Sequence, residues 1–312
     1  MEVRQVLDPA DLYEVDSDVP DLHDAVLIHR LDGFVDAGSA GELLADHLLS
    51  TFEHRVIARF DVDSLIDYRA RRPAMRFVTD HWEHYQTPEL VVHLLHDTAG
   101  TPFLLLTGPE PDHNWEAFCA AVIELVERWG ARLTVGVHGI PMGVPHTRPL
   151  GVTAHATRTE LIGEFNQMPS QIQVPGSASA LLELRLGELG RDAAGFAAHV
   201  PHYLSQSAYP SASVELLEHL VRLTGLVIPT ATLQEAAEAA VVEVNRQVGE
   251  STEVGDVVAA LERQYDSFTE ATEQNNSLLA EAKGHMPTAE ELGSVFEQFL
   301  AEQQGYADPP EH

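Results

Sequence analysis

Cysteine is almost absent from this chain of 312 residues, because Cys119 is the only one. A single thiol can form no intramolecular disulfide and no multi-cysteine zinc site, so disulfide-built and zinc-finger folds are excluded. Long apolar runs are lacking too, since no stretch approaches the roughly 18 to 20 residues that span a membrane. The first twenty residues carry neither the basic segment nor the apolar segment of a secretory signal. We therefore expect a cytoplasmic protein with no membrane partner.

Positive charge is also scarce. Lysine and arginine number 18 against 49 aspartates and glutamates, which gives a formal net charge of -31. Protein cations supply most of the affinity for nucleic acid by neutralising phosphates, so this balance predicts no nucleic-acid partner. What the chain does have is the composition of a globular protein, with 44% hydrophobic residues and a length that suits one large or two ordinary domains.

The order of the hydrophobic patterns predicts an α/β fold. Residues 25–35 read as a buried strand that runs through a glycine-rich turn into a helix. Residues 102–138 then predict a strand, an amphipathic helix that ends at Gly130, and a second strand, which is the unit that builds a parallel sheet. Weaker strand patterns lie at 54–60, 75–79, 89–96 and 151–157, and helical patterns lie at 177–188 and 213–223.

The last eighty or so residues differ in character from the rest. From Thr232 onward the pattern is helical, and residues 230–312 contain 17 acids against three bases, a charge of -14. This region is either a solvated helical bundle or a docking surface for a basic partner. We expect a polar leader at 1–21, an α/β/α domain at 22–228 and an acidic helical region at 229–312.

Three loops are expected to meet at one edge of the sheet. In open α/β sheets ligands bind beyond the carboxyl ends of the parallel strands, where the following loops converge. The loops that carry polar and glycine residues are 33–41 (GFVDAGSAG), 107–116 (TGPEPDHNWE) and 138–148 (HGIPMGVPHTR).

In the first loop the candidate ligand-binding residues are Asp36, Gly38 and Ser39. Gly38, Ser39 and Gly41 stand at a helix start, where free backbone N–H groups favour an anion. Ser39 and Glu42 also fit a capping box that needs no ligand. The segment approaches the G-x-S-x-G motif of serine hydrolases but lacks its first glycine.

In the other two loops, Asp112 or His113 is expected to cap the next helix, while Asn114 and Glu116 face the shared edge or solvent. The third loop adds His138, His146 and Arg148 between stiffening prolines. Arg148 and Arg158 are candidates for holding an anionic group, or they form ordinary salt bridges. The candidate ligand-binding residues are thus Asp36, Gly38, Ser39, His113, Asn114, Glu116, His138, His146, Arg148 and Arg158.

Metal and cofactor chemistry has little support in the sequence. Histidine is abundant, but the H-E-x-x-H motif and the zinc-deaminase motif are both absent. We expect no metal and no cofactor, and no residue can be assigned a catalytic role. Cys119 lies within an amphipathic helix and is expected to be a small packing residue rather than a nucleophile.

Four segments resemble the actinobacterial branch of the proteasome assembly chaperone 2 family, and the resemblance extends from about residue 22 to residue 225. They are GFVDAGSAG at 33–41, LLLTGPEPDHNWEAF at 104–118, GIPMGVPHTRP at 139–149 and VPGSASALLELR at 174–185. The resemblance implies a three-layer α/β/α fold similar to purine nucleoside phosphorylases and nucleosidases, with a mainly parallel sheet. It also implies homo-oligomers, of which we favour a trimer.

For function, the resemblance implies a non-enzymatic assembly or interaction role, with proteasome subunits or another protein as partner. Relatives that dock on the proteasome ring carry a terminal hydrophobic-Tyr-any tripeptide, whereas this sequence ends YADPPEH, so we do not expect docking by that route. The phosphorylase-like relatives imply an alternative. This is a nucleoside phosphorylase or hydrolase, or a small-ligand sensor, whose pocket is formed by loops 33–41, 107–116 and 138–148.

Overall fold

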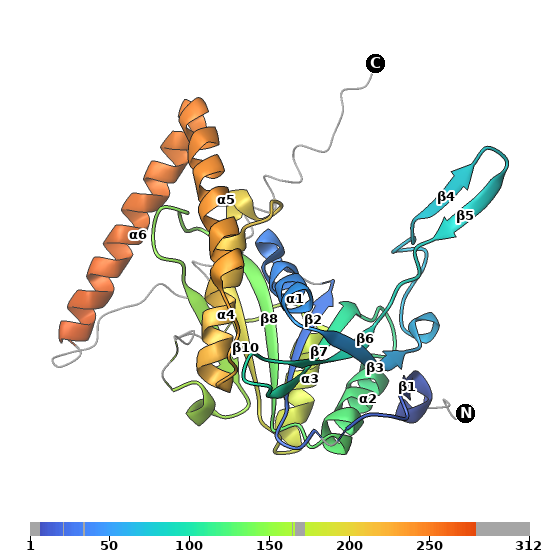
Figure 1. Cartoon of the computed structure of the whole chain (residues 1–312). Coiled ribbons are helices and arrows are strands. Elements are labelled where there is room, and N and C mark those ends of the chain that lie inside the picture. The colour runs from blue at the N-terminus through green and yellow to red at the C-terminus, as the bar shows by residue number, and fades with distance from the viewer. Residues whose placement is uncertain (1–6, 21, 34, 164, 166–171, 279–312) are drawn as a thin grey trace, which may run out of the picture. The chain divides into compact units, whose positions relative to one another are not determined.

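The computed structural model describes residues 7–20, 22–33, 35–163, 165 and 172–278 (Figure 1). Its contacts divide the chain into two compact units. The first is Met1–Gln167 with Gly176–Glu262, and the second is Met168–Pro175 with Arg263–His312. All the strands lie in the first unit. The described part of the second unit is residues 172–175 and the end of the last helix, so the fold below is that of the first unit.

An eight-stranded sheet forms the centre of the first unit. Its strands are β1 (Tyr13–Val15), β2 (Val26–Asp32), β3 (His54–Phe60), β6 (Val91–His96), β7 (Pro102–Pro109), β8 (Leu133–Met142), β9 (Val152–Ala156) and β10 (Ala193–Pro201). They follow the order β1-β3-β6-β7-β2-β8-β10-β9. The four strands β7, β2, β8 and β10 pair in parallel, and the strands outside them pair antiparallel.

The sheet is therefore mixed, and the prediction of a mainly parallel sheet was wrong outside the four central strands. A parallel pair needs a crossover of a dozen or more residues. Only residues 97–101 connect β6 to β7, so these two strands can pair only as an antiparallel hairpin. The parallel centre is the part that matters for the site, because it brings the carboxyl ends of β2, β7 and β8 to one edge.

Helices cover both faces of the sheet and make three layers (Figure 1). On one face lie α1 (Ala40–Thr51), α4 (Pro210–Thr224) and α5 (Ala231–Glu250), whose Leu44, Leu216 and Leu233 share a hydrophobic cluster with β2, β8 and β10. On the other face lie α2 (Trp115–Arg128) and α3 (Ala178–Glu188), whose Phe118 and Leu182 belong to a second cluster. The α/β/α architecture was predicted correctly.

The strand predicted at 75–79 is present but lies outside the large sheet. Residues Met75–Val78 form β4, which pairs with β5 (His81–Tyr85) in a separate two-stranded sheet. Single turns of 3₁₀ helix complete the fold at Pro9–Leu12, Ala37–Ser39, Val62–Ser64, Thr159–Leu161 and His202–Leu204.

The carboxyl-terminal region is helical as far as it is described. The helix α6 (Thr252–Leu278) follows α5, begins in the first unit and continues into the second. The first unit extends through Glu262, and its carboxyl-terminal helices contain the buried residues Leu233 and Ala237 of α5 and Val258 of α6. The expected division at residues 21 and 228 stays a prediction, and residues 279–312 lie outside the described part. Among the described helices, none is both long and apolar enough to cross a membrane.

Candidate functional site

The three loops do meet at the carboxyl edge of the parallel strands. The backbone N–H of Glu110, in the loop after β7, donates to the Asp32 carbonyl at 2.7 Å at the end of β2. The backbone N–H of Gly139, in β8, donates to the Asp36 carboxylate at 2.9 Å. The loop after β2 is thus bonded to both of its neighbours, as the parallel pairing predicts.

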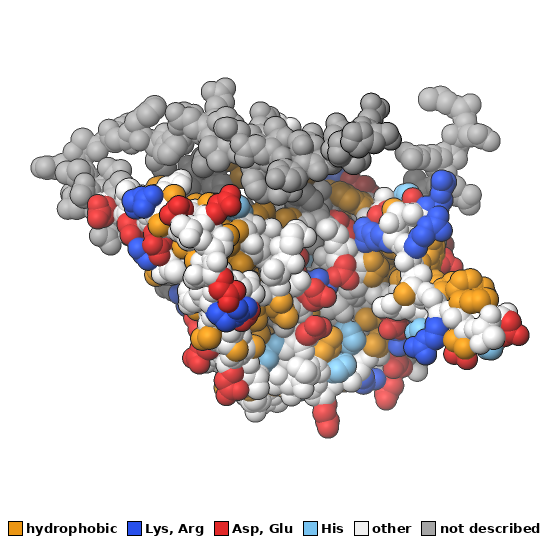
Figure 2. Space-filling view, turned by 90° about the horizontal axis from the view of Figure 1, so that it is seen from above, with side chains coloured by type: hydrophobic (Ala, Val, Ile, Leu, Met, Phe, Trp, Pro, Cys, Tyr) orange, Lys and Arg blue, Asp and Glu red, His pale blue; other side chains and the backbone are white. Residues whose placement is uncertain are grey.

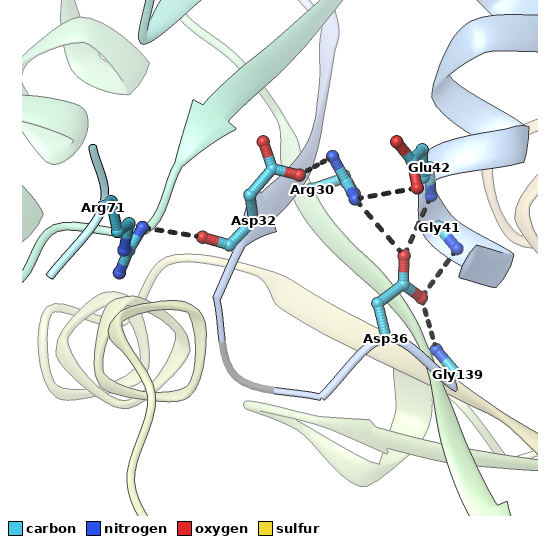
Figure 3. Close-up of polar contacts among 7 residues, drawn as sticks. All are labelled: Arg30, Asp32, Asp36, Gly41, Glu42, Arg71 and Gly139. Carbon is cyan, nitrogen blue, oxygen red and sulfur yellow. Dashed lines mark hydrogen bonds and ion pairs between the residues drawn. The ribbon is translucent and has the colours of Figure 1, made fainter. Parts of the chain in front are cut away.

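Asp36 lies at the centre of this edge (Figure 3). Its carboxylate accepts the N–H of Gly41 at 2.8 Å and of Glu42 at 3.0 Å, both in the first turn of α1, in addition to that of Gly139. Free N–H groups and the helix dipole make the start of a helix favourable for negative charge. The anion-binding position that the sequence predicts here is filled by a carboxylate of the chain itself.

A buried arginine accompanies Asp36. The Arg30 guanidinium forms an ion pair with Asp32 and lies 3.6 Å from the Asp36 carboxylate and 3.8 Å from that of Glu42 (Figure 3). The Arg30 and Asp36 side chains are 12% and 14% exposed, whereas those of Asp32 and Glu42 are about half exposed, so only the first two charges compensate each other away from bulk solvent. Burial raises the pKa of Asp32 above its ordinary value, although Arg30 acts in the opposite direction. At this edge Arg30 therefore lies among three carboxylates, and Arg71 donates to the Asp32 carbonyl at 3.0 Å.

The capping role expected for Ser39 was wrong. Ser39 has φ +49° and its side chain caps no N–H of α1, because Asp36 reaches those groups from three residues earlier. The turn needs Gly38, which has φ +68° and lies against Tyr209, where a side-chain carbon would stand 2.9 Å from the Tyr209 Cβ. This close packing leaves Gly38 buried.

The second loop is tied to neighbouring elements. Asp112 accepts the Asp67 N–H and pairs with Arg71, both at 2.7 Å, and so does not cap α2. The His113 side chain is exposed and its backbone N–H donates to Leu65, so it caps nothing either. The residue at the cap position is Asn114, in the left-handed region at φ +57°, and its amide donates to the Ser64 carbonyl at 2.9 Å.

Glu116 belongs to the same loop but faces α3. Its carboxylate receives two hydrogen bonds from Arg185, at 2.6 and 2.9 Å. This bidentate pair joins α2 to α3 on the outer face of the fold. Of the two predicted positions for Glu116, the shared edge or solvent, the structure shows the second, with Glu116 in an exposed ion pair.

The third loop turns towards α5 and α6. His146 is buried, with its Nδ1 2.7 Å from the Tyr203 hydroxyl and its Nε2 3.1 Å from the Asn245 side-chain oxygen on α5. Arg148 forms an ion pair with Glu262 of α6 at 3.3 Å. Arg158 lies beyond β9 at the amino-terminal end of β10, where it pairs with Asp192 at 2.6 and 2.7 Å. Arg158 is therefore at the opposite edge of the sheet from Asp36.

His138 lies in β8 and belongs to a row of histidines that we had not expected. The other members are His29 of β2 and His155 of β9; after burial, His138 and His155 contribute to lowering the pKa of His29, and His155 contributes to lowering that of His138. Burial lowers the pKa of both His29 and His138 to about 4, so both rings are neutral at neutral pH. The sequence does contain a sign that His29 is buried, because alternation along the strand puts residue 29 on the same face as Leu27 and Leu31.

Within the described residues, no group of three or more histidine, cysteine or acidic side chains could hold a metal ion. An open cavity of about 440 Å³ is lined by residues 59–63, Tyr68, Tyr85 and residues 87–91. None of its lining residues belongs to the three loops. Most of the predicted loop residues thus bind other elements of the chain, and the cavity lies elsewhere in the first unit.

The comparisons with known proteins agree with the loop motifs. Residues 31–248 match the PAC2 family. A solved structure of a Mycobacterium tuberculosis protein of unknown function is 49% identical, with a TM-score of 0.82 over 86% of this chain and 92% of that one. A protein of unknown function from Corynebacterium glutamicum is 39% identical, with a TM-score of 0.80 over 84% and 99%.

A proteasome-assembly chaperone homologue from Mycobacterium tuberculosis is 25% identical, with a TM-score of 0.69 over 75% of this chain and 99% of that one. No curated protein matches the sequence. The family match covers well over half of the chain, and the three solved relatives above come from actinobacteria. The chain belongs to the PAC2 family, as its loop motifs predicted.

Proposed function

We propose that this chain is a non-enzymatic cytoplasmic protein that assists the assembly of other proteins. Family membership supports the role, since a relative is a proteasome-assembly chaperone homologue. The observation that carries the proposal is the state of the loop edge. An active site needs polar groups that are free to meet a substrate, whereas Asp36, Asp112 and Glu116 are engaged by other groups of the chain.

Proteasome subunits are the first partners to test, and the acidic carboxyl-terminal helices are a second surface that a basic partner could use. The expected homo-oligomer belongs to the same proposal. The full chain is mixed with purified, unassembled proteasome α- and β-subunits of its own host and examined by native mass spectrometry. We expect a stoichiometric complex with one subunit type and faster ring formation. Absence of any complex at micromolar concentration would reject proteasome subunits as partners.

The alternative is a nucleoside phosphorylase or hydrolase, or a small-ligand sensor, with phosphate at the turn before α1. The position of Asp36 argues against it, because its carboxylate holds the N–H groups that a phosphate would need. Calorimetric titration of the full chain with inorganic phosphate and adenosine separates the two functions. We expect no binding below millimolar concentration, and a tighter complex would support the alternative.

A further inference from the structure

Residues 67–73, in the segment that leads to β4, concentrate positive charge in a chain that has little of it. They contain three arginines against one acid, Asp67, which gives a local charge of +2 in a chain of -31. Figure 2 shows a group of arginine side chains, in blue, at the side of the molecule where this segment lies. We call residues 67–73 the arginine turn.

Hydrogen bonds to the backbone define the shape of the arginine turn. The Asp67 carbonyl accepts the N–H groups of Ala70 and Arg71, both at 3.0 Å. The Asp67 carboxylate accepts the N–H of Arg69 at 2.8 Å. Together these bonds close a single helix-like turn. Because the turn is formed before any ligand arrives, less conformational entropy is lost when one binds.

The arginine turn is also anchored to the loop edge. One oxygen of the Asp112 carboxylate accepts the Asp67 N–H at 2.7 Å, and the other pairs with the Arg71 guanidinium at 2.7 Å. Arg71 donates in addition to the Asp32 carbonyl at 3.0 Å (Figure 3). The turn therefore lies beside the end of β2 and the loop after β7, at the edge where the sequence predicts ligand-binding residues.

Arg69 and Arg72 differ from Arg71 in having no carboxylate partner. Both side chains are exposed, and neither forms an ion pair within the described part of the chain. Other exposed arginines do pair, as Arg158 does with Asp192 at 2.6 Å. In a chain with 49 acids, two guanidiniums of one turn are thus left available to carboxylates that another molecule brings.

The chemistry of the turn favours an acidic peptide over other anions. A guanidinium suits a carboxylate, which accepts two parallel hydrogen bonds from it. One exposed ion pair contributes little, so a free small anion binds weakly, whereas two carboxylates on one segment act together. Nucleic acid is disfavoured, because its affinity comes from many phosphate contacts and the chain carries a charge of -31. Exposed carboxylates more than about 8 Å away are largely screened at physiological ionic strength, so they oppose an acidic peptide only weakly.

We propose that the arginine turn is a docking surface for an acidic segment of a partner protein, whose carboxylates bind the guanidiniums of Arg69 and Arg72. Arg71 has a positioning role, because its contacts with Asp112 and Asp32 hold the turn in place. This surface is distinct from the acidic carboxyl-terminal helices, which suit a basic partner. The inference goes beyond the proposed assembly role and does not depend on whether proteasome subunits are the partners.

The first experiment measures the fluorescence anisotropy of a labelled peptide that alternates glutamate with serine, mixed with the full chain. We expect a dissociation constant below about 1 mM, and we expect Arg69→Gln with Arg72→Gln to raise it about 10-fold. No binding by the unmodified chain at about 1 mM would overturn the proposal.

A matched control removes the same two charges elsewhere on the surface. Arg128 is exposed in the last turn of α2, and Arg191 pairs with Glu127 before β10. We expect Arg128→Gln with Arg191→Gln to change the dissociation constant by less than about 2-fold, because distant charges are screened. An equal effect of the two pairs of substitutions would mean that the peptide responds to net charge alone, and would overturn the proposal.

Competing anions test the class of ligand. Inorganic phosphate or a short single-stranded RNA is added to the peptide complex at constant ionic strength. We expect the peptide to stay bound at about 10 mM phosphate, and the RNA to bind more weakly than the peptide. Displacement by phosphate below that concentration would identify a small-anion site, and tighter binding of RNA would identify a nucleic-acid surface. Either result would overturn the proposal.

Photo-crosslinking locates the bound peptide on the full chain. The glutamate–serine peptide carries a photoreactive group at its centre, and mass spectrometry identifies the residues to which it becomes linked. We expect links within residues 64–73 and 112–114, which the hydrogen bonds of Asp112 and Asn114 hold together. The links should be lost in Arg69→Gln with Arg72→Gln. Links confined to other surfaces would contradict the arginine turn as the docking surface.

Discussion

The Asp36 carboxylate accepts the backbone N–H of Gly139 at 2.9 Å, although 103 residues separate them in the sequence. The same carboxylate holds the first turn of α1. One side chain therefore joins the loop after β2, the start of α1 and strand β8. In doing so it connects two of the loops for which the sequence predicts ligand-binding residues, 33–41 and 138–148.

Replacing Asp36 should cost considerable stability. Asp36→Ala removes three hydrogen bonds to a charged acceptor and leaves the Arg30 guanidinium with less compensation, so we expect a loss of about 3 kcal/mol in the free energy of unfolding. Urea denaturation followed by circular dichroism measures it. Asp46→Ala on the exposed face of α1 is the control, and an equal loss in both variants would show that Asp36 has no special part in the fold.

The buried histidines should make the fold sensitive to acid. The pKa of His29 is lowered to about 4 in the folded protein, mainly by burial, against 6.5 in the unfolded chain. The unfolded state therefore binds more protons as the pH falls below about 6.5, and stability decreases towards pH 4. We expect His29→Gln to reduce the loss of stability between pH 7 and pH 5 by about 2 kcal/mol.

Unfolding free energies at several pH values test this expectation. His113→Gln serves as the control, because the His113 side chain is exposed and its loss should leave the pH dependence as it is. If the His29→Gln protein loses as much stability in acid as the wild type, then other groups take up the protons that accompany unfolding. His138 would be the next residue to replace.

Cys119 should be unreactive in the folded protein. The side chain is buried, and burial raises the pKa of its thiol to about 12, so the reactive thiolate is scarce at pH 8. We expect iodoacetamide to alkylate Cys119 about 100-fold more slowly in the folded protein than in the chain unfolded by about 8 M urea. Mass spectrometry of the labelled chain gives both rates, and fast labelling without denaturant would mean that α2 opens readily.

His146 is expected to hold α5 against the loop after β8 through its hydrogen bonds. Its ring bridges Tyr203 and Asn245, and with Nε2 donating to the Asn245 oxygen, Nδ1 accepts from the Tyr203 hydroxyl. We expect His146→Ala and Asn245→Ala to be non-additive by about 1 kcal/mol in a double-mutant cycle. Hydrogen exchange in α5 should increase in both variants. Strict additivity would show that the two side chains stabilise the fold independently.

The sequence predicted the elements that carry strong periodicity. Within the strand predicted at 25–35, Val26–Asp32 form β2, and the three- and four-residue spacing around Phe118 forms α2. The sequence analysis predicts no strand over β10, because four of its nine residues are alanine and Val200 is its one β-branched residue. Gly195 in that strand lies under the His155 ring, a contact between distant residues that no local pattern reveals.

The candidate site was predicted in position but not in detail. Parallel pairing was enough to bring the loops after β2, β7 and β8 together. The partners of their side chains could not be read from spacing, since Asp36 binds Gly139 and His146 binds Asn245, each about 100 residues away. For the same reason Arg158 looked equivalent to Arg148, although the antiparallel β9 carries it to the opposite edge of the sheet.

The two ends of the large sheet have a practical consequence for handling the protein. A strand at a sheet edge offers unpaired backbone groups to other chains, and short edge strands limit this kind of aggregation. Here the edges are β1, with three residues, and β9, with five. Unwanted precipitation at high concentration should therefore start at the hairpin of β4 and β5, so solubility would improve most with substitutions there.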